Sequence, residues 1–305
     1  MPNDASVAIL LATYNGAPFI AEQLRSLVDQ SAGPIDLIIS DDGSTDQTLE
    51  EIEQAVGEWP LLLSGPRQGF HENFRHLILH APLDDQFYAF CDQDDVWQKD
   101  KLAMAIVALE ALPADVPALY CSRTTTVSSD GTPIGQSPLF RKAPGFKNAL
   151  VQSIAGGNTM VMNRAAFEIV RKSAERTSFV SHDWWCYMLV TGTGGRVIYS
   201  PASSIDYRQH AGNVVGTNSS IFAKLARIRR LFEGRFAGWN GRNVESLMRC
   251  RDLLREDVVR TIEMFEEARH SSLAKRLFAL YRSGVFRQTF AGNLGLVVAC
   301  AIGKL

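Results

Sequence analysis

Three carboxylates, Asp92, Asp94 and Asp95, lie within four residues and directly follow the apolar run 87–90. Carboxylates this close repel one another unless a cation or hydrogen-bond donors compensate them. Such hard oxygen ligands suit Mg²⁺ or Mn²⁺, with water and phosphate oxygens completing the coordination. A solvated acidic turn that caps the next helix is the alternative interpretation. The apolar flanks 87–90 and 96–97 favour the metal site because they bury both ends of the loop.

Two more polar loops, 13–16 and 41–44, each follow an apolar run typical of a buried strand. Ligands of open α/β sheets bind outside the carboxyl ends of the strands. If the strands are parallel, all three loops lie on one edge of the sheet. Asp42 can then accept a hydrogen bond from a nucleobase N–H or a ribose hydroxyl, and Thr13 and Tyr14 can supply a ring and backbone groups. Turns and helix caps are the alternative roles of these residues.

Strand and helix signals alternate along the first part of the chain, which predicts βαβ units and a parallel sheet. The predicted strands are 7–12, 35–39, 61–63 and 87–90, and the predicted helices are 17–30, 46–56, 71–80 and 98–111. Beyond residue 118 the pattern loosens into short strands at 119–120, 160–162 and 196–199, with a helix at 182–190. From about residue 221 onward the sequence reads as helical and basic.

The composition excludes several classes of protein. Apolar residues make up 46% and charged residues 21%, so the chain can bury a core, and a net charge of −2 argues against binding nucleic acid. Five scattered cysteines without C-x-x-C spacing favour a reducing compartment. No signal peptide is visible, and the apolar run 294–302 is shorter than the about 20 residues of a spanning helix, so we expect a cytoplasmic protein.

The charge is unevenly distributed. Residues 1–215 carry 15 Lys and Arg against 25 Asp and Glu, whereas residues 216–305 carry 16 against 8. We therefore predict a domain at 1–215 and a basic helical region at 216–305. The segment 221–236 has the pattern of an interfacial amphipathic helix, and with the apolar end 294–302 it predicts peripheral docking on the inner face of an anionic membrane. A packed helix with a solvated basic side is the alternative.

The motifs 11–16, 39–46 and 91–97 resemble, in order and spacing, three motifs of family 2 glycosyltransferases. The later segments 156–159, 182–185 and 207–213 resemble the bacterial rhamnosyltransferase branch of that family. The resemblance covers about residues 5–215. It implies a GT-A fold, which is a Rossmann-like, mostly parallel mixed sheet flanked by helices, here followed by a C-terminal helical segment. It also implies a nucleotide-sugar donor, a divalent Mg²⁺ or Mn²⁺ ion and inversion at the anomeric carbon.

The resemblance also implies roles for single residues. Asp183 matches the catalytic base, although many members carry Glu-Asp where this chain has His182-Asp183. The remaining assignments are Thr13, Tyr14, Asn15, Asp42 and Asp92 for the donor nucleotide, Asp94, Asp92 and His210 for the metal, and Gly157, Asn158, His182, Trp184 and Arg208 for the sugar or acceptor. Without the resemblance, Asp183 reads equally as a helix cap, Trp184 as a core residue, and His210 and Gly157 as loop and turn residues.

These features together predict a metal-dependent inverting glycosyltransferase. Its expected donor is dTDP-L-rhamnose, and its expected acceptor is a growing cell-surface polysaccharide or a lipid-linked saccharide. A UDP-hexose donor is the alternative within the same fold. A non-catalytic nucleotide-sugar binding module would not need a base such as Asp183, and a nucleotidyltransferase would carry a Gly-rich phosphate loop that this chain lacks.

Overall fold

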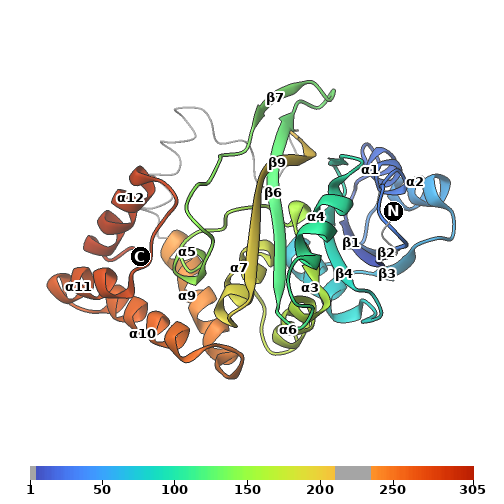
Figure 1. Ribbon diagram of the computed structural model, residues 1–305. Helices are drawn as coiled ribbons and strands as arrows, with labels where there is room; N and C mark the ends of the chain where they lie inside the picture. Colours follow the sequence, from blue (N-terminus) through green and yellow to red (C-terminus); the bar gives the residue numbers. More distant parts are fainter. Residues whose placement is uncertain (1–4, 210–234) are drawn as a thin grey trace.

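The computed structural model describes residues 5–209 and 235–305. They form one mixed sheet with helices on both faces and further helices at one end (Figure 1). The strands are β1 (Val7–Thr13), β2 (Ile35–Asp41), β3 (Leu61–Ser64), β4 (Phe87–Asp92), β5 (Val96–Trp97), β6 (Ala118–Val127), β7 (Pro133–Gln136), β8 (Val161–Asn163) and β9 (Arg196–Arg208). The helices are α1 (Ile20–Val28), α2 (Thr48–Val56), α3 (Phe70–His80), α4 (Lys101–Glu110), α5 (Phe146–Ala149), α6 (Arg164–Ala174), α7 (His182–Gly192), α9 (Arg235–Arg249), α10 (Glu256–His270), α11 (Leu273–Ser283) and α12 (Phe290–Ala301), with 3₁₀ turns at Gly157–Thr159 and Arg251–Leu253.

The strand order in the described residues is β3-β2-β1-β4-β8-β6-β9-β5, with β7 paired to β6. Strands β3, β2, β1 and β4 run parallel to one another, and β9 runs parallel to β6. Strands β8, β7 and β5 pair antiparallel with their neighbours. The predicted mixed, mostly parallel sheet is therefore confirmed. The α/β alternation of the first 110 residues follows the predicted order.

Strand β1 shows why a wholly apolar run becomes a central strand. Its side chains alternate between two cores, because successive residues of a strand point to opposite faces. Ala8 and Leu10 face the core that contains α3, α6 and α7, whereas Ile9 and Leu11 face the core that contains α1 and α4. Both faces are covered, so neither set of side chains meets water, as is typical of parallel strands.

The C-terminal helices pack on the same core as the sheet. Leu247 of α9, Phe265 of α10 and Leu296 of α12 belong to the hydrophobic cluster that also holds Leu10 and Trp185. The predicted boundary at 215 and most of the amphipathic segment 221–236 lie outside the described residues. Within the described ranges, no helix is both long and apolar enough to span a bilayer.

Candidate functional site

The three polar loops meet at the carboxyl ends of β1, β2 and β4. In the sheet register Thr13 pairs with Asp41, and Ala12 pairs with Asp92. The backbone N–H of Asp42 donates to the carbonyl oxygen of Thr13 at 2.9 Å. The expectation that these loops share one edge of the sheet is therefore met, because the parallel strands end at the same level.

Asn15 ties the first loop to the second. Its backbone N–H donates to Ser44 Oγ at 2.8 Å, and its Oδ1 accepts from the N–H of Thr45 at 2.8 Å. Asn15 has a φ of 47°, a left-handed conformation that Asn tolerates better than most residues. The side-chain oxygen of Asn15 is thus used in holding the two loops together. Next to it the ring of Tyr14 is 54% exposed and has a face available for stacking.

Gln93, the middle residue of the acidic motif, ties the first loop to the third. Its Oε1 accepts from the Thr13 hydroxyl at 2.7 Å and from the Tyr14 N–H at 2.9 Å, and its Nε2 donates to the Tyr14 carbonyl oxygen at 3.1 Å. A Cβ added at Gly16 would lie 2.3 Å from this Oε1, so any other residue there would displace the Gln93 side chain. Neither Gln93 nor Gly16 was assigned a role from the sequence, although each lies inside one of the three motifs.

Asp41 and Asp42 have different partners. The carboxylate of Asp41 accepts from the Ser44 N–H at 2.9 Å and from the Ser44 hydroxyl, which closes the turn after β2. Asp42, only 7% exposed, accepts from the N–H groups of Arg67 and Gly69 at 2.6 and 2.7 Å. Asp42 therefore holds the loop between β3 and α3, and any nucleobase contact must use the remaining lone pairs of its oxygens.

The acidic turn brings three carboxylates into electrostatic contact. Burial raises the pKa of Asp92 to about 7, and the negative charges of Asp94 and then Asp183 add to this increase. Asp183 comes from the first turn of α7, far from the motif in sequence. Burial raises the pKa of Asp183 as well, whereas hydrogen bonds from Ser181, Trp184 N–H and Ser153 oppose the increase. A cation would relieve the repulsion within this cluster.

Asp95 faces inward and holds the turn. It is 1% exposed; one carboxylate oxygen accepts from the Asn158 amide, and the other accepts from the Arg208 N–H at 3.3 Å. Burial and the charges of Asp92 and Asp94 raise its pKa well above the ordinary range. Asn158, predicted to contact sugar, therefore links the loop before β8 to the acidic turn.

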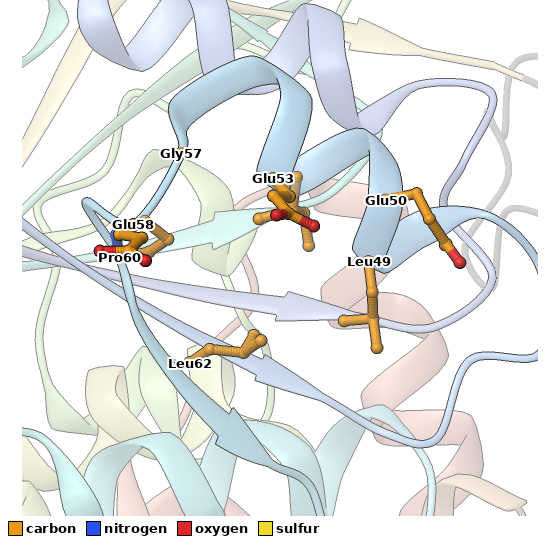
Figure 2. A pocket seen from close by; sticks show the side chains of 8 residues that line it. Leu49, Glu50, Glu53, Gly57, Glu58, Pro60 and Leu62 are labelled. Carbon is orange, nitrogen blue, oxygen red and sulfur yellow. The ribbon is translucent and has the colours of Figure 1, made fainter.

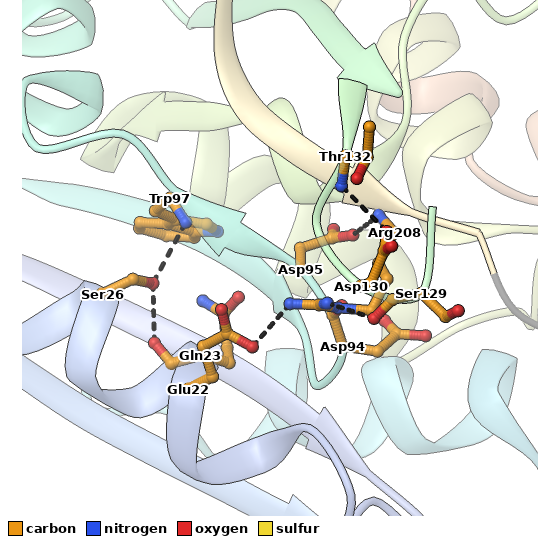
Figure 3. Close-up of polar contacts among 10 residues, drawn as sticks. All are labelled: Glu22, Gln23, Ser26, Asp94, Asp95, Trp97, Ser129, Asp130, Thr132 and Arg208. Carbon is orange, nitrogen blue, oxygen red and sulfur yellow. Dashed lines mark hydrogen bonds and ion pairs between the residues drawn. The ribbon is translucent and has the colours of Figure 1, made fainter. Parts of the chain in front are cut away.

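Arg208 connects the acidic turn to two other elements (Figure 3). Its side chain is 6% exposed, and its guanidinium donates to Glu22 of α1 at 2.6 Å, to the Ser129 carbonyl oxygen at 2.8 Å and to the Asp94 carbonyl oxygen at 3.3 Å. A buried guanidinium with these partners holds backbone in place. The structure thus gives Arg208, predicted to contact sugar or diphosphate, a positioning role.

Lys101 lies beneath the acidic turn and was not singled out in the sequence. It is fully buried, its Nζ lies 3.3 Å from the centroid of the Trp97 ring, and burial lowers its pKa to about 7. This ammonium makes no hydrogen bond to the described residues. Electrostatic interactions with Cys91 and then Asp95 raise the pKa of Lys101 in turn, so its amine lies close to both side chains.

His182 is enclosed by aromatic rings. Its imidazole stacks on Phe74 at 3.7 Å between ring centroids and meets Phe90 edge-on at 4.8 Å. Neither ring nitrogen has a hydrogen-bond partner in the described part of the chain, and burial lowers its pKa to about 3. A Cβ added at Gly157 would lie 1.9 Å from His182 Nε2, so this glycine must remain glycine for the ring to fit.

Trp184, for which the sequence allowed either a sugar contact or a place in the core, is buried in α7. It is 7% exposed, and its indole N–H donates to the Ala149 carbonyl oxygen at 2.6 Å. The ring therefore packs in the core, which is the alternative that the sequence also allowed. His210 lies outside the described residues, so the structure does not place it.

The fit of a divalent metal rests on the donor set. Asp92 and Asp94 offer carboxylate oxygens at the sheet edge, where burial first, and then the charges of Asp94 and Asp183, raise the pKa of Asp92. No group of three or more His, Cys, Asp or Glu side chains is arranged to hold a metal within residues 5–209 and 235–305. Two carboxylates nevertheless fit Mg²⁺ or Mn²⁺, which commonly take their remaining ligands from water and substrate phosphates.

A groove between α2 and β3 lies away from this cluster (Figure 2). Leu49 and Leu62 line it together with three carboxylates, those of Glu50, Glu53 and Glu58. None of the predicted site residues takes part. Three carboxylates without a basic partner in the lining would repel a nucleotide diphosphate, so this groove is not the donor site.

Comparisons with known proteins agree with these features. The model of glycosyl transferase family 2 matches residues 8–170. The dTDP-rhamnosyl transferase RfbG of Shigella flexneri is 31% identical over 235 residues, which cover 72% of this chain and 78% of that protein. The UDP-Glc:alpha-D-GlcNAc-diphosphoundecaprenol beta-1,3-glucosyltransferase WfgD of Escherichia coli is 29% identical over 105 residues, 34% of this chain and 41% of that protein.

The fold is also found among solved structures. The crystal structure of residues 1–349 of TarS of S. aureus, in complex with UDP-GlcNAc, superposes with a TM-score of 0.54 at 17% sequence identity, over 98% of this chain and 89% of that one. The likeness extends over the C-terminal helices as well as the sheet. The three ordered motifs, the family match and the extent of the similarity to RfbG together show that the chain belongs to glycosyl transferase family 2 and is a glycosyltransferase.

Proposed function

We propose that this glycosyltransferase moves L-rhamnose from dTDP-L-rhamnose to a saccharide or lipid-linked acceptor, with inversion at the anomeric carbon and with a divalent cation. The observation that carries the reaction class is the meeting of Asp92 and Asp94 with Asp183 from a distant helix. The choice of donor is supported by the similarity to a dTDP-rhamnosyl transferase over 72% of the chain. The similarity to WfgD, whose acceptor is a sugar linked to diphosphoundecaprenol, supports a lipid-linked acceptor.

In this proposal the nucleotide lies across the ends of β1 and β2. Tyr14 stacks on the base, Asp42 accepts a hydrogen bond from it, and Thr13 and Asn15 hold the loop that carries the ring. Asp92 and Asp94 would hold the cation, and His210, which lies outside the described residues, is the further ligand that the family resemblance implies. When bound, the cation offsets the charge that builds on the leaving diphosphate.

Asp183 is the proposed general base. The acceptor hydroxyl loses its proton to the Asp183 carboxylate while its oxygen bonds to the anomeric carbon. The bond from that carbon to the diphosphate oxygen breaks, and the diphosphate leaves with the electron pair. A raised pKa makes Asp183 a better proton acceptor, and hydrogen bonds from Ser181 and Ser153 hold its orientation. Gly157 and Asn158 border the acceptor side.

The test is turnover with a panel of donors in the presence of Mn²⁺. We expect transfer or slow hydrolysis of dTDP-L-rhamnose and little reaction with UDP-glucose or UDP-GlcNAc. Preferential turnover of a UDP-hexose would refute the rhamnosyl donor while leaving the transferase assignment intact. Binding of dTDP-rhamnose without turnover under any acceptor condition would instead support a binding module.

A further inference from the structure

Helices α11 and α12 present a broad apolar face to solvent. On α11 the exposed residues Leu273, Leu277 and Tyr281 recur every four positions, and Phe278 lies beside them. Tyr281 is 84% exposed, and residues that recur at this spacing lie on one side of a helix. The opposite side of α11 is buried through Ala279 and Leu280.

Helix α12 continues this face. Its exposed apolar residues are Phe290, Leu294, Val297 and Val298, followed by Ile302 just after the helix. Phe290 is 86% exposed, and the twelve residues of α12 include no charged side chain. Helices α11 and α12 pack on each other (Figure 1), and we call their exposed apolar side chains together the α11–α12 face. Water-soluble proteins rarely expose so many large apolar side chains together without a binding partner.

The charges around the α11–α12 face indicate the partner. Residues 271–305 contain five basic residues, Lys275, Arg276, Arg282, Arg287 and Lys304, and no Asp or Glu. Lys275 and Arg282 are exposed, and the guanidinium of Arg282 lies 5.8 Å from the centroid of the Phe278 ring. A second copy of the chain would bring like charges together. An anionic lipid surface satisfies both the apolar side chains and the cations.

We propose that the α11–α12 face docks the protein on an anionic membrane, with the apolar side chains at the level of the lipid headgroups and the basic side chains on lipid phosphates. This inference does not rest on the choice of sugar donor. It narrows the sequence prediction, which combined 221–236 with the apolar end 294–302. That end lies almost entirely in α12, and the structure adds the exposed side chains of α11.

The connection between the two helices links this face to the acceptor side of the candidate site. Asn148 Nδ2 donates to the Phe286 carbonyl oxygen at 2.9 Å, and the Gln288 N–H donates to Gln152 Oε1 at 2.9 Å. The next residue along that segment is Ser153, whose hydroxyl donates to the Ala155 carbonyl oxygen at 3.1 Å and lies close enough to Asp183 to lower its pKa. Docking through α11 and α12 would therefore fix the position, relative to the membrane, of the segment that borders the proposed base.

The test is co-sedimentation of the full chain with vesicles, without any sugar substrate. One set is pure phosphatidylcholine, and the other contains about one third phosphatidylglycerol. We expect binding to the anionic vesicles, at least about tenfold weaker binding to the neutral ones, and a decrease with salt. The triple variant Tyr281→Ser, Phe290→Ser, Leu294→Ser should lose at least about tenfold in binding. Replacing Lys275 and Arg282 by Gln should each weaken it about fivefold.

The matched control is the triple variant Val107→Ser, Ile134→Ser, Leu62→Ser, which changes exposed apolar residues on α4, β7 and β3. It should bind vesicles as the unmodified chain does. Thermal melts and dTDP binding, measured on every variant, establish that the variants are folded and separate this test from that of the proposed function. Equal vesicle binding by both triple variants would overturn the proposal. So would a dimer in light scattering that the α11–α12 variant converts to a monomer without any vesicle binding.

Discussion

Replacing Arg208 by Met tests whether the acidic turn depends on a distant guanidinium. Met keeps the aliphatic stem and removes the charge and the donors that reach Glu22, Ser129 and Asp94. Loss of the hydrogen bond to the Ser129 carbonyl oxygen at 2.8 Å should cost about 1.5–3 kcal/mol, because the donor is charged and buried. The ion pair adds at most about 1 kcal/mol, because the Glu22 side chain is 53% exposed.

The expected loss is therefore about 1.5–4 kcal/mol in the free energy of unfolding, which for a chain of this size corresponds to a Tm lower by roughly 2–6 °C. The same change frees the backbone at Asp94 and weakens the contact between the Arg208 N–H and Asp95. Mutating a residue that orients metal ligands typically lowers metal affinity by about 10–100-fold. The apparent affinity for Mn²⁺, measured in the presence of the nucleotide, should therefore fall at least about tenfold.

The assay combines thermal melts with titration of Mn²⁺ at fixed dTDP. Arg249→Met is the matched control, because Arg249 pairs with Glu245 on the exposed side of α9 and should contribute less than about 0.5 kcal/mol. A destabilised Arg208→Met protein with unchanged Mn²⁺ affinity would refute the positioning role. An unchanged Tm would refute the energetic reasoning itself.

Three further changes probe the site. Asp183→Asn should lower kcat by at least about a hundredfold with donor binding retained, and normal turnover of the variant would contradict the base assignment. In the unmodified enzyme the acid limb of the kcat–pH profile should lie above the pKa of an ordinary carboxyl group, since burial raises the pKa of Asp183 and the base acts only when deprotonated. Gly157→Ala places a Cβ 1.9 Å from His182 Nε2 and should lower the free energy of unfolding in urea by about 1–3 kcal/mol. The same substitution made in a His182→Ala background should cost less. If the effects of the two substitutions simply add, the contact does not exist. Gly16→Ala displaces Gln93 and should weaken dTDP binding in calorimetry at least about tenfold; unchanged affinity would show that the loop is not used.

The strand framework was predictable because burial on both faces leaves a direct trace in the sequence. The run that forms β1 is apolar throughout, and the polar loops begin where the parallel strands end. Helix α6 was missed although its signal is present: the Asn163 side chain accepts from the Ala166 N–H, which is an N-cap. Strand β7 is short, exposed and contains Pro and Gly, so its pairing with β6 leaves little trace in the sequence.

The parts of the site that come from a single sequence motif could be predicted. The parts that depend on contacts between distant segments of the chain could be predicted less well. Proximity of Asp183 to Asp92 came from the family resemblance, because the spacing of two residues so far apart in the chain does not indicate contact. The inward orientation of Trp184 and the burial of Arg208 depend on tertiary packing. Gln93 lies inside the recognised motif, yet its partners, Thr13 and Tyr14, become visible only when β1 and β4 pair.

The central claim is that Asp92 and Asp94 hold a divalent cation that binds the leaving diphosphate. Calorimetric titration of dTDP into the protein, with Mn²⁺ and with EDTA, tests it most directly. We expect Mn²⁺ to tighten dTDP binding at least about tenfold in the unmodified chain. In Asp94→Asn this gain should be lost, while the metal-free affinity stays the same or improves. Equal dTDP affinity with and without Mn²⁺, or a full Mn²⁺ effect in Asp94→Asn, would contradict it.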